Sequence, residues 1–186
     1  MQIVMGPAPG ARAEDETTPG PASGLRGTDE VHLRRVLGHF LTGVTVVTAL
    51  SEGRPVGMTV NSFTSLSLDP PMVLFCPHAS SVTGRRIVRS GAFAVNILGS
   101  HQQRLAERFA ARHPDRFGGV QVRPGATGSP IIVEALGFVD CRVADEICHG
   151  DHRIVVGEVV EADVLRKGEP LGFFRGSYLG SRGGWR

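Results

Sequence analysis

Apolar residues recur along this chain in short runs of the kind that form strands, separated by Gly, Pro, Ser and Asp. Two β-branched, apolar runs, 44–50 and 54–61, flank a Ser-Glu-Gly turn and predict a pair of antiparallel strands. A second pair, 136–147 and 153–165, alternates apolar and polar residues on either side of a tight turn at 149–152, which predicts a long β-hairpin. Further short strands are predicted at 62–68, 72–76, 93–98 and 171–174.

Three helices are predicted between these strands, over about 28–41, 80–90 and 100–111. The regular strand–helix–strand alternation of a doubly wound sheet is missing. We therefore predict a mainly β fold, an antiparallel, Greek-key-like barrel with peripheral helices. Each helix begins at residues whose side chains can cap free N–H groups, namely Thr28 or Asp29, Ser80 or Ser81, and Ser100 with Gln103 as a capping box.

The two ends of the chain differ in composition from its centre. Residues 1–28 are rich in Gly, Pro, Ala and Thr and hold almost no large apolar residues, so we expect a disordered N-terminal tail. Residues 181–186 are rich in Gly and Arg, and we expect a loose C-terminal tail. The predicted domain spans 29–180.

Composition excludes several classes of function. The chain has 186 residues, of which 41% are hydrophobic, and a formal net charge of +2, which is typical of one globular domain. The charge is too small to predict nucleic-acid binding, and no apolar run is long enough for a membrane span. The three cysteines are few and odd in number, which favours reduced thiols and a cytoplasmic location.

The stretch 57–71 is dense in small hydroxyl residues, yet it has the alternation of a strand. We expect Leu66 and Leu68, with Thr64, to point to one side, and the side chains of Phe63, Ser65 and Ser67 to point to the other. A hydroxyl face beside an apolar face could line the rim of a core and meet a flat polar ligand. On composition alone, a solvated edge strand explains the same pattern.

The helix predicted to begin near Ser80 combines hydroxyl groups, free backbone N–H groups and two arginines, Arg85 and Arg86. These are the elements of an anion site, because the N-terminal end of a helix carries a partial positive charge. An ordinary capped surface helix with solvated arginines is the alternative.

Other familiar sites are missing or incomplete. The chain contains no G-x-G-x-x-G string after a strand, no Walker A string and no G-x-S-x-G turn. The segment 148–152 packs four potential metal ligands into five residues, but no matching pair of ligands is visible elsewhere. We therefore predict no metal site.

Several ordered motifs between about Val36 and Tyr178 resemble a known family, the short-chain flavin reductases. These proteins are the reductase components of two-component flavin-dependent monooxygenases and have the FMN-binding split-barrel fold. The motifs are FLTGVTVVT at 40–48, GMTVNSFTSLSLDPP at 57–71, FAVNIL at 93–98, RFA at 108–110, GDH at 150–152, GEV at 157–159 and PL at 170–171.

The resemblance implies a set of contacts with a flavin and a nicotinamide. His152 would lie by the nicotinamide as the catalytic residue, and Tyr178 would close that side of the site. A turn histidine and a packed tyrosine are the structural alternatives. The implied flavin contacts are Thr59, Val60, Asn61, Ser62, Phe63, Ser65 and Leu66 along the ring, Ser80, Ser81, Val82, Thr83, Arg85 and Arg86 at the phosphate, and Phe109 near the cofactor.

The function that the resemblance implies is an NAD(P)H:flavin oxidoreductase. NADH or NADPH would reduce FAD or FMN, and the reduced flavin would leave for a separate monooxygenase. The family forms homodimers, so a homodimer is implied as well. Two alternatives stay open, a non-catalytic flavin carrier or sensor on the same barrel and, less well matched by 57–71, a flavin-dependent oxidase of a vitamin B6-like amine.

Overall fold

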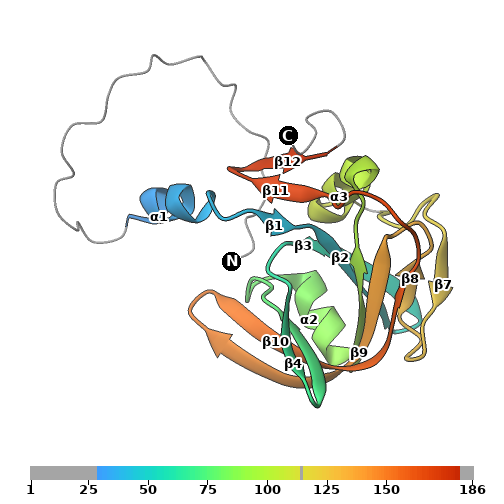
Figure 1. Ribbon diagram of the computed structural model, residues 1–186. Coiled ribbons are helices and arrows are strands. Elements are labelled where there is room, and N and C mark those ends of the chain that lie inside the picture. Colours follow the sequence, from blue (N-terminus) through green and yellow to red (C-terminus); the bar gives the residue numbers. More distant parts are fainter. Residues whose placement is uncertain (1–28, 114, 181–186) are drawn as a thin grey trace, which may run out of the picture.

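A computed structural model describes residues 29–113 and 115–180 of the chain (Figure 1). The predicted disordered and loose tails, 1–28 and 181–186, lie outside the described residues.

The main body is one antiparallel sheet of seven strands, which confirms the predicted antiparallel barrel. Strands that are neighbours in the sheet are often distant in the chain, as in a Greek key. In sheet order the strands are β3 (Arg54–Val60), β2 (Thr45–Ser51), β6 (Ala92–Ile97), β9 (Gly137–His149), β10 (His152–Val164), β5 (Pro71–Phe75) and β4 (Thr64–Leu68).

The two edge strands of this sheet, β3 and β4, follow one another in the chain. They are joined by residues 61–63, and four peptide steps from Val60 to Thr64 reach at most about 14 Å. In a flat sheet the outer two of seven strands would lie about 29 Å apart. The sheet must therefore curl until its edges almost meet, and the barrel stays split there because β3 and β4 do not pair. We call residues 61–63 the seam.

The interior of the barrel is apolar and aromatic. The rings of Phe75 and Phe93 are both fully buried and meet edge to face, with centroids 5.1 Å apart. Gly157 of β10 makes room for Phe93, since a Cβ at this position would overlap that ring. The β9–β10 pairing shifts register between Val156 and Gly157, so a bulge bends the hairpin at this contact.

A small sheet of β1 (Thr42–Gly43), β11 (Gly172–Phe174) and β12 (Ser177–Leu179) lies at one end of the barrel, near α3 (Gln103–Ala110) (Figure 1). Neither β1 nor β12 was predicted. The first helix, α1 (Glu30–Leu37), begins at the predicted cap Asp29, but it ends four residues earlier than predicted. The reason is that Gly38 caps it and the chain then extends to pair with β11.

The second helix, α2 (Val82–Arg89), begins at the predicted cap, since Ser81 Oγ accepts the N–H of Gly84 at 3.0 Å. The predicted capping box of the third helix is wrong by one residue. The side chain of Gln102, not Gln103, reaches back to accept the N–H of Gly99 at 2.9 Å. This contact belongs to a 3-10 turn, η1 (Ser100–Gln102), that precedes α3.

A two-stranded ribbon of β7 (Val122–Pro124) and β8 (Pro130–Ile132) was also missed. A loop joins its two strands. The buried carboxylate of Asp140 holds this loop, because its oxygens accept from the N–H of Thr127 at 2.7 Å and from the hydroxyl of Thr127 at 2.6 Å. Within the described residues, no helix is long and apolar enough to cross a membrane.

Candidate functional site

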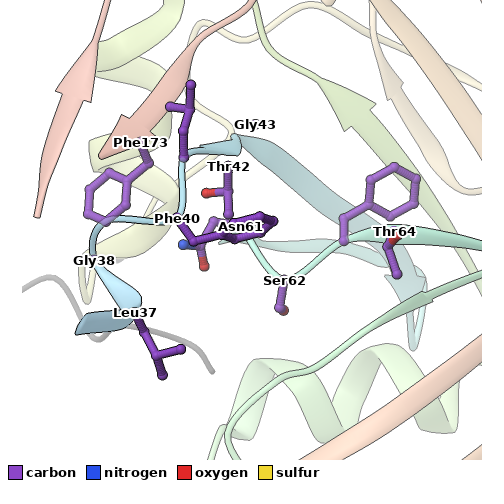
Figure 2. A pocket seen from close by; sticks show the side chains of 11 residues that line it. Leu37, Gly38, Phe40, Thr42, Gly43, Asn61, Ser62, Thr64 and Phe173 are labelled. Carbon is purple, nitrogen blue, oxygen red and sulfur yellow. The ribbon is translucent and has the colours of Figure 1, made fainter. Parts of the chain in front are cut away.

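A pocket of about 480 Å³ opens at the seam of the barrel, which is an ordinary size for a small-molecule site. Residues from the seam, from α1 and the segment after it, and from the small sheet contribute to it (Figure 2). Its lining consists of Leu37, Gly38, Phe40, Leu41, Thr42, Gly43, Asn61, Ser62, Phe63, Thr64 and Phe173.

One side of the pocket is polar. The seam residues Asn61, Ser62 and Phe63 lie between β3 and β4 and belong to neither strand, and Asn61 and Ser62 bring polar side chains to the pocket. Thr42 adds a buried hydroxyl that has no hydrogen-bond partner within the described part of the chain. Leaving a buried hydroxyl without a partner is costly, so Thr42 favours a ligand with a polar edge.

Most of the other lining residues are apolar. Leu37 and Phe40 enter from α1 and the segment after it, and Phe173 enters from β11 (Figure 2). The side chain of Phe40 is 76% exposed, although it is one of the largest apolar groups of the lining. A flat ligand with one polar edge and an apolar body would cover the apolar side chains of the lining and form hydrogen bonds to its polar groups. The isoalloxazine ring of a flavin is such a ligand, so the residues present fit it.

Two of the residues predicted to meet the ring are core residues instead. Thr59 and Val60 are 5% and 2% exposed. The hydroxyl of Thr59 donates to the backbone oxygen of Ala106 at 2.5 Å, so it ties α3 to β3 and is turned away from the pocket. The carbonyl of Val60 accepts the hydroxyl of Thr45 at 2.8 Å. A contact of these two residues with a flavin ring stays a prediction.

Ser62 and Phe63 line the pocket as predicted, but their side chains also hold the seam in place. Ser62 Oγ accepts the N–H of Cys76 at 3.0 Å and lies 3.2 Å from the carbonyl oxygen of Cys76. This pair of contacts joins the seam to the end of β5. Phe63 is half-buried and packs against the core of the barrel. The backbone of the seam is thus fixed from both sides.

The predicted apolar face of β4 does not face the core. Leu66 and Leu68 are 50% and 88% exposed, because β4 is an edge strand and its pairing with β5 shifts register between Ser65 and Ser67. Ser65 and Leu66, which were predicted as ring contacts, are exposed and do not line the pocket described above.

The predicted phosphate-binding residues begin α2, but their side chains diverge. Val82 is 64% exposed. Arg85 turns back and donates to the carbonyl of Ala79 at 3.0 Å. Arg86 turns along the barrel to the hydroxyl of Ser51 at 3.4 Å. Ser81 Oγ caps the helix. The hydroxyl of Thr83 instead accepts a hydrogen bond from a side chain of another segment.

That other segment carries Arg116, which the sequence analysis missed because 112–119 is polar and irregular. Arg116 Nη1 donates to Thr83 Oγ1 at 3.0 Å and to the carbonyl of Gly57 at 3.1 Å. Burial lowers the pKa of Arg116. A usable signal was the aromatic residue that follows it, since Phe117 packs edge to face on Phe109 at 4.9 Å and anchors the segment.

Phe109 was predicted to lie near the cofactor, but it is a core residue. It is 1% exposed, and a Cβ on Gly57 would meet its ring at 2.7 Å. Phe109 therefore packs against β3 at Gly57, and its predicted place near the cofactor stays a prediction.

His152 lies at the tip of the β9–β10 hairpin in a cluster with Asp151, His78 and Ser80. Its Nδ1 is 2.7 Å from Asp151 Oδ1, and this hydrogen bond is the main cause that lowers the pKa of Asp151. The ring of His78 meets that of His152 edge to face at 5.2 Å. His78 Nδ1 in turn accepts the N–H of Ser80 at 3.1 Å. His78 was not predicted, and it connects His152 to the predicted phosphate end.

Tyr178 lies on β12, with its ring edge to face on Phe173 at 5.4 Å. Burial, with a smaller contribution from Glu107, raises the pKa of Tyr178. Its strand partner Phe173 lines the pocket, so Tyr178 supports the pocket wall from behind. A nicotinamide contact of Tyr178 stays a prediction.

Metal ligands were searched for in the described ranges, 29–113 and 115–180. No group of three or more His, Cys, Asp or Glu residues there could hold a metal ion.

Comparison with known proteins gives the family. The flavin reductase like domain matches residues 37–181, which is most of the chain. The reductase subunit HsaB of a flavin-dependent monooxygenase from Rhodococcus jostii (strain RHA1) is 41% identical, over 89% of this chain and 85% of its own length. The FMN reductase (NADH) SmoA of Agrobacterium fabrum is also 41% identical, over 82% of this chain and 86% of its own length.

A solved structure agrees with these relatives. The NADH:FAD oxidoreductase SgcE6 of Streptomyces globisporus, crystallised in complex with NAD and FAD fragments, superposes with a TM-score of 0.78. It is 39% identical, and the match covers 85% of this chain and 96% of the other. The split barrel, its ordered motifs and these relatives agree, and the chain belongs to the flavin reductase family.

Proposed function

We propose that this protein is an NAD(P)H:flavin oxidoreductase that reduces FAD or FMN and supplies the reduced flavin to a partner monooxygenase. The observation that carries the proposal is the pocket at the seam, whose lining combines the polar side chains of Thr42, Asn61 and Ser62 with large apolar side chains. Such a site suits the ring of a flavin, and the family supplies the chemistry. A bound flavin accepts a hydride at N5 from C4 of the nicotinamide.

The residues of the chain would serve mainly to orient the flavin and the nicotinamide, and less to donate or accept protons. The seam is held by Ser62 and Phe63, so the backbone of 61–63 is fixed beside the pocket, where it would meet the edge of a bound ring. At the hairpin tip, Asp151 accepts from His152 Nδ1–H and so fixes the orientation of the imidazole. A fixed orientation of this ring supports a role for His152 in placing the nicotinamide.

The test is to mix the purified protein with NADH or NADPH and with FAD or FMN, and to follow the nicotinamide absorbance band. We expect nicotinamide oxidation that depends on both the protein and the flavin. A protein that binds flavin but oxidises no nicotinamide would be a carrier or sensor, which contradicts the proposal. Replacing His152 by Ala should lower the rate or raise KM for NADH, while flavin affinity is kept.

We also propose that the protein is a homodimer. Several large apolar side chains are exposed, among them Val31 on α1, Phe40 in the pocket lining and Leu68 on β4, which is 88% exposed. A second copy would cover such a face. Light scattering after gel filtration should give the mass of a dimer. Leu68→Glu should shift it toward the monomer, whereas Val164→Glu, at a site 77% exposed on β10, should not.

The cytoplasm is the location that we propose. Cys76, Cys141 and Cys148 are all free, and burial together with the neighbouring Asp140 raises the pKa of Cys141 to about 12. A chain whose thiols stay reduced fits a reducing compartment, which is also where NADH and a partner monooxygenase would be available. Fractionation of cells with an antibody against the protein tests this.

A further inference from the structure

Arg116 joins three segments that are far apart in the chain. Its Nε and Nη2 donate to the carbonyl of Ala111 at 3.1 and 2.8 Å, which fixes the arginine to the end of α3. Its Nη1 donates to the carbonyl of Gly57 on β3 and to Thr83 Oγ1 on α2. The guanidinium therefore lies between the start of α2 and the strand that leads into the seam.

Among the described residues, no carboxylate is paired with the positive charge of Arg116. All of these acceptors are neutral oxygens. Burial already disfavours the charge, as the lowered pKa shows. A partly buried cation without an anion is costly, so this arrangement points to an anionic ligand.

Thr83 is the second part of the argument. Its oxygen accepts from Arg116, so its own proton is directed toward another acceptor. Arg85 and Arg86 do not share this place, because they turn to Ala79 and Ser51. Of the three arginines, Arg116 is the one that meets the first turn of α2.

We propose that Arg116 is a specificity-determining residue for phosphorylated flavins, which pairs with the phosphate and holds the hydroxyl of Thr83 toward it. This inference rests on the proposed function and names the group that tells FMN from riboflavin. A charge-assisted hydrogen bond is about twice as strong as a neutral one, and Arg suits phosphate geometry.

The experiment measures the dissociation constants of FMN and riboflavin by quenching of flavin fluorescence, at one ionic strength, for the full chain. We expect the unmodified protein to prefer FMN. Arg116→Gln should weaken FMN binding about 10- to 100-fold, the range for losing one hydrogen bond to a charged group, and should change riboflavin binding less than about twofold. Arg112→Gln removes the same charge from an exposed neighbour and is the matched control, which should leave both constants unchanged.

Two further variants keep the test decisive if Arg116→Gln folds poorly. Arg116→Lys retains the charge but cannot reach Ala111, Gly57 and Thr83 together, so FMN affinity should fall to an intermediate value. Thr83→Val removes only the hydroxyl and should weaken FMN several-fold, again without an effect on riboflavin. Circular dichroism and thermal melts verify that each variant is folded.

The outcomes separate the inference from the function on which it rests. Equal losses for FMN and riboflavin in folded Arg116 variants would show a purely structural arginine and overturn the inference. Equal affinity of the unmodified protein for the two flavins would overturn it too, while the proposed function stands. Failure of the unmodified protein to bind any flavin would overturn the proposed function itself.

Discussion

The motif 57–68 falls into two halves with different surroundings. Its first half, Gly57 to Val60, is buried on β3, where Gly57 touches Phe109 and Thr59 bonds to α3. Its second half, from Asn61 onward, leaves the sheet, lines the pocket and ends on the exposed edge strand β4.

The difference shows that one continuous family motif can serve two purposes. The first half is constrained by packing, because no side chain larger than hydrogen fits between Gly57 and Phe109. The second half lines the pocket and makes the short crossing between the sheet edges. Substitutions in the two halves should therefore act on different measurements, stability for the first and flavin affinity for the second.

The largest effect is expected for Phe109→Ala. Removing a fully buried ring beneath β3 should lower the free energy of unfolding by about 3–5 kcal/mol. Urea unfolding measures this loss. Flavin affinity of the folded protein should change little, since Phe109 is 1% exposed. A large loss of affinity with stability preserved would break the distinction between the two halves.

Thr59→Val should lower the free energy of unfolding by about 1–3 kcal/mol. The substitution keeps the shape of the side chain but leaves the buried carbonyl of Ala106 without this donor. Thr59→Ser is the matched control, because it retains the hydroxyl. Flavin affinity should be the same in both variants, and a selective loss in Thr59→Val would place this hydroxyl in the ligand site after all.

Asn61→Ala should act in the opposite way. It removes a pocket-lining amide, so flavin affinity should fall about 2- to 10-fold, the range for one neutral hydrogen bond. Stability should change by less than about 0.5 kcal/mol, as for other partly exposed sites. Ser65→Ala, on the exposed β4 outside the pocket, is the control and should leave fluorescence titrations with flavin unchanged.

The smallest effect concerns pH. The hydrogen bond from His152 lowers the pKa of Asp151 in the folded protein, so the carboxylate stabilises the fold above its unfolded pKa of about 3.9. This contribution is lost as pH falls from there through the lower folded pKa. It should be small, because Asp151 is exposed.

Asp151→Asn should therefore remove a small part of the acid sensitivity of the melting temperature between pH 5 and pH 2 (about the span of these titrations). The control is Asp145→Asn, an exposed acid on the same hairpin, which should leave the profile as it was. Identical profiles for Asp151→Asn and the unmodified protein would contradict this role of the hydrogen bond.

Much of the fold was predictable from the sequence because local signals dominate it. The hairpin of β9 and β10, the capped start of α2 and the strands β2, β3 and β6 follow from alternation, turns and caps. The exposure of the apolar side chains of β4 was not predictable, because an alternating pattern does not show which face of a strand is covered. That depends on its position at the edge of the sheet.

The site was predictable in outline but not in its members. Asn61, Ser62 and Phe63, predicted as flavin contacts, line the pocket, whereas Thr42 and Phe40, which also line it, came from a segment identified only as a family motif. Arg116 and His78 were missed because their contacts cross between distant segments. No local pattern records such contacts.

The length of the seam has a consequence for how the barrel could be changed. Three residues tether the two free edges of the sheet, and no ladder bond between β3 and β4 opposes their separation. Inserting a few glycines between Val60 and Thr64 would lengthen this connection and let the two edges of the barrel move apart. The aperture that admits a ligand could thus be widened by loop length alone, with all seven strands keeping their present partners.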